Sequence, residues 1–489
     1  MNRTVRRIIG DMRSRDASTR RGAFRGADSQ FMREHNRFLV LNCVRERGPL
    51  ARAAIARQTG LSRTTVGAII DALLADGLVR EGETTPSATS AGGRPATLVH
   101  FNAAAGYVLG VDMGRSHLTL LLTDLASQVV ARRSGPFATD RGPEICVAEV
   151  VNGLGDFLSA HAVTWSQVVG LGLGIPGPMD IGQHKLISPP RMPGWNGVKV
   201  RSIFQQALTV PVYVENDANL GALGESRYGA GRDVSGLAYI KIGTGIGGGL
   251  VIDGQVYHGS RGSAGEIGHV AIDIPGDEQR LVCSCGNRGC LEVVAGADAI
   301  VADARSAFSL RRKAPLDVPA SGALDALPHP DIADVVQAAL DGDRASLAAI
   351  ERAGEHIGVA LASLVNLINP SLILVDGAVA RAGELLLGPI RRAVASRSLA
   401  IASRQTRIAV GELGDNAIAL GGVATVLDAA FAPSAGFTAV EAGMRAATAV
   451  AEIEVARSPY GEGSSEGYPE GYPKLAVSAR DPPPAQIAD

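Results

Sequence analysis

The stretch GLAYIKIGTGIGGGLVIDG, residues 236–254, decides the fold. Two apolar runs flank a turn of closely spaced glycines, a pattern that predicts a β-hairpin. Residues 107–125, YVLGVDMGRSHLTLLLTDL, repeat the pattern with a turn at Gly114. Glycines and hydroxyls at such tips let backbone N–H groups approach phosphate oxygens. Two hairpins of this type, each opening a lobe, predict two α/β halves that face a cleft.

The tips and the segments between them supply the candidate cleft residues. VVGLGLGIPGPMD (168–180) indicates a strand that ends in a glycine-proline turn, and VPVYVENDANLGALGE (210–225) indicates a strand followed by a helix. We place a domain at 105–430, with lobe 1 at about 105–218 plus the C-terminal helix and lobe 2 at about 219–410. The candidate phosphate contacts are Asp112, Gly114, Ser116, Gly243, Thr244 and Gly245.

Composition sets the class of protein. With 489 residues, 46% hydrophobic and 20% charged, the chain is long enough for three lobes and has the composition of a globular protein. It contains no run of eighteen apolar residues and no secretory h-region, so we expect a cytoplasmic protein without membrane contact. Five cysteines, an odd number, fit a compartment in which thiols stay reduced.

Charge is divided unevenly along the chain. Residues 1–98 hold 17 Arg, no Lys and 9 acidic residues, a balance of +8, whereas the whole chain has a net charge of -2. A basic head on an acidic body favours a nucleic-acid-binding module, although a solvated charge run would give the same balance.

The pattern within the head favours DNA binding. ARAAIARQTGLSRTTVGAIIDALLADGLV (51–79) reads as helix, tight turn and helix, with Val66, Ile69, Ile70, Leu73 and Leu74 as a buried stripe. Two strand-like runs and a polar loop follow, which predicts a winged helix-turn-helix domain at 31–101. Its candidate DNA contacts are Ser62, Arg63, Thr64 and Thr65 at the start of the second helix, and Arg94 of a Gly-Arg-Pro tripeptide suited to the minor groove.

Three of the five cysteines lie in CSCGNRGCLE, residues 283–292. His269, Cys283, Cys285 and Cys290 form a series of one nitrogen and three sulfurs, which is the ligand set of a closed structural zinc site. The alternative is three ordinary small cysteines.

These features together resemble the ROK family of repressors, open reading frames and kinases. The resemblance covers roughly residues 31–430 and rests on the head, Asp112-x-Gly114, Glu215-Asn216-Asp217, GTGIGGG, and GEIGH followed by CSCGNRGCLE. It implies a two-lobed, actin-like sugar kinase fold of the ribonuclease H type behind the winged helix-turn-helix head. It also implies the same four zinc ligands, with IDIPGDEQRL (272–281) as an insertion between His269 and the cysteines.

Sugars are bound by carboxylates and carboxamides that converge on pairs of hydroxyl groups. The resemblance carries the sugar contacts of the family onto Asn216, Asp217, Glu266, His269 and Glu292. His269 can bind zinc with one ring nitrogen and a sugar hydroxyl with the other, which would join the metal to ligand occupancy.

Two functions follow from the resemblance. In family kinases the residue that matches Asp217 is the catalytic base, and ATP with magnesium would be the cofactor of such a glucokinase-like enzyme. This chain departs from their Asp-x-Gly-Gly-Thr-Lys with Arg115, Ser116 and His117, and it has Asp376 near the expected adenosine position. We therefore favour a non-enzymatic, sugar-responsive transcriptional regulator of carbohydrate uptake and catabolism genes, a repressor that binds operator DNA as a homodimer or tetramer.

Other points stay open at this stage. The second half could bind a partner protein instead of a sugar. Residues 346–368 form an amphipathic helix for the core or for a subunit contact. Residues 1–30 suggest a disordered basic arm, or an extended translation start, and 431–489 a low-complexity tail.

Overall fold

The computed structural model describes residues 29–84, 96–183, 185–189, 192–272, 281–312 and 330–432. Almost all of the expected arm and of the expected tail, the polar loop with Arg94 and most of the insertion lie outside these residues. In the part of the chain described, no helix is both long enough and apolar enough to cross a bilayer.

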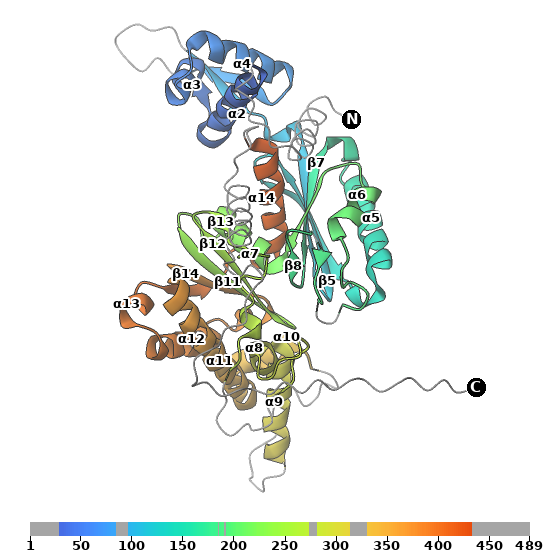
Figure 1. Ribbon diagram of the computed structural model, residues 1–489, viewed down its shortest axis with the longest axis vertical. Coiled ribbons are helices and arrows are strands. Elements are labelled where there is room, and N and C mark those ends of the chain that lie inside the picture. The colour runs from blue at the N-terminus through green and yellow to red at the C-terminus, as the bar shows by residue number, and fades with distance from the viewer. Residues whose placement is uncertain are drawn as a thin grey trace, which may run out of the picture. The chain divides into compact units, whose positions relative to one another are not determined.

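The head contains three helices and a small sheet (Figure 1). The helices are α2 (Ser29–Arg47), α3 (Arg52–Thr59) and α4 (Arg63–Ala75). Strands β1 (Leu50–Ala51), β2 (Val79–Thr84) and β3 (Thr97–Phe101) pair in the order β1-β3-β2. In the expected stripe of α4, Val66, Ile70 and Leu73 are buried, while Ile69 and Leu74 are half-buried against the same core.

The turn between α3 and α4 follows from its residue types. Gly60 has a φ of 70°, a left-handed conformation that glycine adopts at little cost, and it ends α3. The Ser62 Oγ accepts a hydrogen bond from the backbone N–H of Thr65 at 3.0 Å and so caps α4. The predicted helix, turn and helix are therefore present at the predicted positions.

Lobe 1 is built on a five-stranded sheet in the order β10-β7-β4-β5-β6. Its strands are β4 (Tyr107–Met113), β5 (His117–Asp124), β6 (Val129–Pro136), β7 (Val168–Ile175) and β10 (Val212–Asn216). The first three form an antiparallel meander, whereas β7 and β10 run parallel to β4. Helices α5 (Pro143–Ala160) and α6 (Val200–Ala207) lie on one face and α14 (Ala417–Phe431) on the other (Figure 1).

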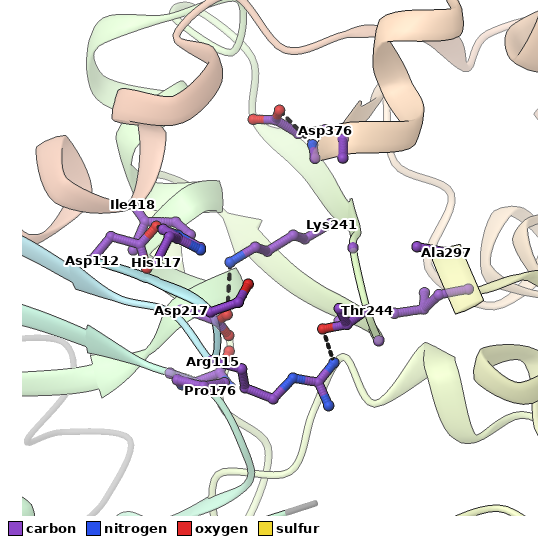
Figure 2. Close-up of a pocket in the computed structure, with 18 of the residues that line it drawn as sticks. Asp112, Arg115, His117, Pro176, Asp217, Lys241, Thr244, Ala297, Asp376 and Ile418 are labelled. Atoms are coloured by element: carbon purple, nitrogen blue, oxygen red, sulfur yellow. Dashed lines mark hydrogen bonds and ion pairs between the residues drawn. The ribbon is translucent and has the colours of Figure 1, made fainter. Parts of the chain in front are cut away.

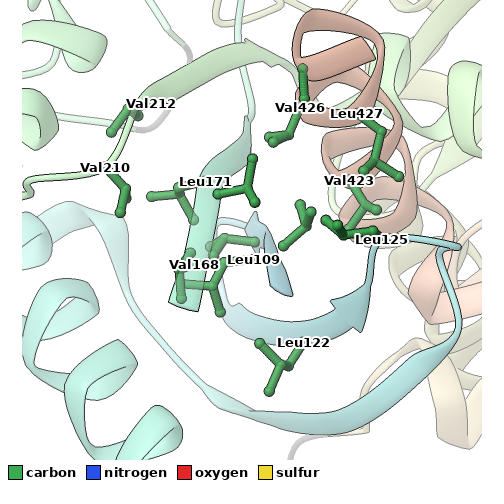
Figure 3. Close-up of a cluster of buried hydrophobic side chains, with 14 of the residues drawn as sticks. Leu109, Leu122, Leu125, Val168, Leu171, Val210, Val212, Val423, Val426 and Leu427 are labelled. Carbon is green, nitrogen blue, oxygen red and sulfur yellow. The ribbon is translucent and has the colours of Figure 1, made fainter. Parts of the chain in front are cut away.

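The core of lobe 1 lies between this sheet and α14. Figure 3 shows Leu109 and Leu171 of the sheet facing Val423 and Val426 of the helix, and all four are fully buried. Glycines let the backbones meet, because a Cβ on Gly110 or Gly172 would lie 2.1 Å from a carbonyl oxygen of α14.

Lobe 2 repeats the plan with a sheet in the order β13-β12-β11-β14-β15. Its strands are β11 (Gly236–Ile242), β12 (Ile246–Ile252), β13 (Gln255–Val256), β14 (Leu372–Asp376) and β15 (Arg407–Val410). The helices are α7 (Asp217–Tyr228), α8 (Leu291–Ala295), α9 (Ala297–Arg312), α10 (Ile332–Leu340), α11 (Arg344–Ile368), α12 (Glu384–Arg397) and α13 (Ala400–Ser403). A two-stranded ribbon, β8 (Met179–Asp180) with β9 (Lys185–Leu186), belongs to the loops of lobe 1.

Alternate side chains of β11 point to opposite faces of the lobe 2 sheet and belong to two separate hydrophobic clusters. Ala238, Ile240 and Ile242 join the cluster of α11, α12 and their neighbours, while Leu237 and Tyr239 pack against α7. Helix α11 has twelve buried residues, so the amphipathic helix expected at 346–368 serves the core of lobe 2. Both expected glycine-tipped hairpins are present, as β4–β5 and β11–β12.

Candidate functional site

A cavity of about 420 Å³ opens between the two hairpin tips and the N-terminus of α7. Every candidate sugar residue lines it, as do five of the six candidate phosphate residues; Gly114 does not. The candidate residues that line it are Asp112, Ser116, Asn216, Asp217, Gly243, Thr244, Gly245, Glu266, His269 and Glu292.

Asn216 and Asp217 are fixed at the start of α7. The Asn216 Oδ1 caps the helix by accepting hydrogen bonds from the N–H groups of Ala218 at 2.9 Å and Asn219 at 3.2 Å. Its Nδ2 donates to the carbonyl of Gly177 at 3.1 Å. Asp217 follows as the first helical residue, with only 9% of its surface exposed. A carboxylate at this place is stabilised by the helix dipole.

Lys241 is the residue of the cleft that the sequence analysis missed. Its Nζ donates to the Asp217 Oδ2 at 3.0 Å (Figure 2). Burial alone would lower the pKa of Lys241, but the charges of Asp217, Asp112 and Asp376 outweigh burial and raise it. The alternation of side chains along β11 could have identified it, because Lys241 lies on the same face of the strand as Leu237 and Tyr239, which pack against α7.

The two hairpin tips are joined by a hydrogen bond. An Arg115 N–H, from the β4–β5 tip, donates to the Thr244 Oγ1 of the β11–β12 tip (Figure 2). The His117 Nε2 lies 2.9 Å from the Asp112 Oδ2. Arg115 and His117, two residues where the chain departs from the kinase pattern, thus occupy the tip that was expected to receive phosphate.

Glu266, His269 and Glu292 form a wall of the cavity beside the β11–β12 tip. Burial raises the pKa of Glu266, whose Oε2 lies 3.9 Å from the His269 Nε2. The Glu292 Oε2 accepts a hydrogen bond from the N–H of Ile246 at 3.2 Å. Gly245 permits this approach, because a Cβ there would lie 2.3 Å from the same Glu292 oxygen.

The four predicted metal ligands lie together beside this wall. One ligand atom from each of His269, Cys283, Cys285 and Cys290 lies within 4.8 Å of the others. The Cys285 and Cys290 sulfurs are 3.7 Å apart, and the Cys283 sulfur is 3.7 Å from the His269 Nδ1. The arrangement can hold a metal. Because Nδ1 faces the sulfurs, the Nε2 of His269 is left facing Glu266.

His258 and Glu215 form a further close pair, at the residue that precedes Asn216. The His258 Nε2 lies 2.7 Å from the Glu215 Oε2, and the Glu215 Oε1 accepts from Asn219 at 3.0 Å. Burial alone would lower the pKa of His258, but the hydrogen bond and charge of Glu215 raise it. Burial alone would raise the pKa of Glu215, and the bond to His258 lowers it instead. The pair therefore fixes Glu215, the residue next to Asn216.

The head presents the predicted DNA contacts of α4 to solvent. Ser62, Arg63 and Thr64 are exposed, and Thr65 is half-buried. Helix α14 links the cavity to the head: Ile418 at its start lines the cavity, and the carbonyl of Phe431 at its end accepts a hydrogen bond from the Asn42 Nδ2 at 2.8 Å. The Phe431 ring also lies 4.6 Å from the Arg45 guanidinium and 5.9 Å from the Phe101 ring.

Comparison with known proteins separates the two regions. The family model of the ROK family matches residues 108–429, and that of a winged helix-turn-helix DNA-binding domain matches residues 33–80. The xylose repressor of Bacillus spizizenii is 30% identical over 402 residues, covering 82% of this chain and 97% of the repressor.

Two solved structures extend the comparison. A ROK family transcriptional regulator, a homologue of the Escherichia coli MLC protein, is 26% identical, with a TM-score of 0.68 over 82% of this chain and 97% of that one. A ROK family glucokinase from Streptomyces griseus, in complex with glucose and AMPPNP, is also 26% identical, with a TM-score of 0.56 over 65% of this chain and 99% of that one. The predicted fold class, a winged helix-turn-helix head before a two-lobed sugar kinase fold, is confirmed.

Proposed function

This chain belongs to the ROK family, and from that premise we propose that it is a sugar-responsive transcriptional repressor of genes for carbohydrate uptake or catabolism. The observation that carries this proposal is that one chain joins a winged helix-turn-helix head to a carboxylate-lined cavity. The xylose repressor aligns along nearly its whole length with both parts. We propose a cytoplasmic location, because a repressor must reach its operator DNA.

The head and the cavity would perform separate tasks. Arg63 and Thr64 stand at the exposed N-terminal end of α4, where side chains of a helix-turn-helix reach base edges and phosphates in the major groove. Asn216, Asp217 and Glu292 would hold sugar hydroxyls. Because α14 touches the cavity at one end and the head at the other, it offers a route by which an occupied cavity changes the head.

Fluorescence anisotropy with labelled DNA from the region upstream of its own gene tests the proposal. Xylose, glucose and N-acetylglucosamine form the first panel, and we expect one sugar to weaken DNA binding at least tenfold. Arg63→Ala should lose DNA binding and keep the thermal shift produced by that sugar, whereas Glu292→Gln should do the reverse. Specific DNA binding that no sugar of a wide panel alters would overturn the proposal.

We further propose that the His269 and cysteine cluster holds structural zinc. A tetrahedral ion with Zn–S bonds of about 2.3 Å separates its sulfurs by about 3.8 Å, close to the observed Cys285–Cys290 spacing. The zinc would hold the segment of Glu266 and the start of α8, which carries Glu292, against the cavity. The ion would have no catalytic part, since all four positions are protein ligands.

Metal analysis of the purified chain should find one zinc per chain. Cys285→Ser should lose it and weaken the sugar response, while Cys43→Ser, a change of a cysteine in α2, should keep both. A wild-type chain that folds and responds to sugar with no metal would exclude the site.

We also propose a homodimer as the DNA-binding unit, because winged heads read half-sites in pairs. Light scattering after size-exclusion chromatography, with and without operator DNA, measures the number of chains. A monomer bound to operator DNA would contradict this assignment.

A further inference from the structure

The glucokinase structure contains glucose and AMPPNP, and the cleft of this chain can be tested for its fit to a nucleotide with magnesium. Three carboxyl groups surround the place where the two hairpin tips meet α7: Asp112 of β4, Asp217 of α7 and Asp376 of β14. Carboxylates at such a place would suit a hydrated divalent cation. Here, however, the ammonium of Lys241 already lies among them.

The ammonium is held by contact and by charge. Lys241 bonds to Asp217 at 3.0 Å, and the lysine and aspartate side chains are only 19% and 12% exposed. Asp376 is satisfied elsewhere, by the Tyr239 hydroxyl at 2.8 Å and by the N–H of Gly377 at 2.6 Å. In the described part of the chain, the buried Asp112 Oδ1 has no hydrogen-bond partner, so its charge is balanced through space by Lys241 and through Oδ2 by His117.

We propose that Lys241 is the resident cation of this cleft and that it excludes a magnesium-bound nucleotide. A divalent ion bound to Asp217 would meet a fixed positive charge at contact distance, and one bound to Asp112 or Asp376 would be repelled through space by the same ammonium. A nucleotide without the ion would bring its phosphates against Asp112 and Asp376. Arg115 also blocks a nucleotide sterically, because its side chain crosses the space between the two hairpin tips to bond with Thr244.

The inference goes beyond the proposed function, because it assigns the ligand class of the whole cleft: an uncharged sugar, bound without nucleotide. It also assigns Asp217 a role other than that of a base. Its Oδ2 accepts a hydrogen bond from Lys241 at 3.0 Å and its Oδ1 accepts one from the N–H of Ala218 at 2.9 Å, so this aspartate serves to orient a hydroxyl.

The test replaces the cation with an amide of similar length. The full chain, loaded with zinc, is titrated with Mn²⁺ and free Mn²⁺ is followed by electron paramagnetic resonance. Lys241→Gln should gain one Mn²⁺ site per chain, with a dissociation constant at least tenfold lower than that of any Mn²⁺ binding by the wild type. Lys241→Arg, which keeps the charge, and Lys199→Gln, which removes an exposed lysine elsewhere, should behave like wild type.

Two further measurements make the result decisive. If Lys241→Gln is destabilised by its unbalanced carboxylates, Mn²⁺ should raise its melting temperature and leave that of wild type unchanged. A glutamine variant that gains no Mn²⁺ affinity, or stays unfolded in Mn²⁺, overturns the inference. So does wild-type binding of Mg·ATP at submillimolar concentration, measured by equilibrium dialysis. None of these readouts involves DNA or sugar, so the proposed function is tested separately.

Discussion

Replacing Gly421 with alanine should separate α14 from α7, and the structure gives the size of the effect. A Cβ on Gly421 would lie 1.9 Å from the carbonyl oxygen of Leu220 and 2.6 Å from its carbonyl carbon, where contacts under 3.0 Å essentially never occur. Both obstacles are backbone atoms of α7, so no side chain can turn aside. The two helices must therefore move apart by roughly 1 Å to admit one methyl group.

Overpacking of this kind costs about 1–3 kcal/mol of unfolding free energy. Alanine recovers about 1 kcal/mol of helix propensity, which leaves a net loss of up to about 2 kcal/mol and a fall in melting temperature of up to about 8 °C. Gly155→Ala in α5 is the matched control, because a Cβ there meets nothing within 4 Å. Gly155→Ala should therefore stabilise the chain by about 0.5–1 kcal/mol.

Differential scanning calorimetry tests whether the melting temperature falls for Gly421→Ala and rises for Gly155→Ala. Because α7 begins with Asp217, Gly421→Ala should also weaken sugar binding, which isothermal titration calorimetry can follow. Equal melting temperatures for the two alanine variants would refute the reasoning, since the contacts of the added methyl group would then have no effect.

Three other changes follow from single contacts. Ser62→Ala removes the cap of α4 and should cost about 1 kcal/mol in thermal melting while weakening DNA binding in anisotropy assays. Phe431→Leu removes an aromatic ring that contacts Arg45 and should reduce, at least threefold, the effect of sugar on DNA affinity without abolishing either binding event. His258→Gln should lower the stability measured by urea unfolding by about 1–3 kcal/mol at pH 6, and by less at pH 9.

The pH dependence of the last prediction follows from the two directions of shift. A raised pKa of His258 gives stability that is complete below about pH 6.5 and is lost as the pH rises through the folded value. A lowered pKa of Glu215 gives stability that is present above about pH 4.5 and is lost as the pH falls through its folded value. A constant difference between wild type and His258→Gln from pH 5.5 to 9 would exclude the pair as its source.

Features with local spacing could be predicted from the sequence. The two helices around Gly60, the glycine-tipped hairpins and the group of three cysteines each lie within a short segment, so spacing alone identifies them. His269 joined the cysteines through residue type, although thirteen residues intervene. The fold brings one ligand atom from each of these four residues together, as predicted.

Contacts between distant segments could not be predicted. Lys241 bonds to a residue 24 positions earlier, and Arg115 to one 129 positions later. The first pairing requires α7 to pack on the lobe 2 sheet, and the second requires the two lobes to fold against each other. Lys241 nevertheless stands out, as one of five lysines in a chain that otherwise uses arginine, inside an apolar strand. This was a second sign, because lysine is rarely placed inside an apolar strand.

The glycine contacts of α14 make it a lever. Its 15 residues span about 22 Å, and backbone contact with α7 and the lobe 1 sheet leaves it little freedom to slide. If α7 tilts, α14 must tilt with it, and a rotation of about 5° about the cavity end would carry Phe431 through about 2 Å. A displacement of that size exceeds the tolerance of a side-chain contact, so a small change around one hydroxyl group can be magnified at the DNA-reading head.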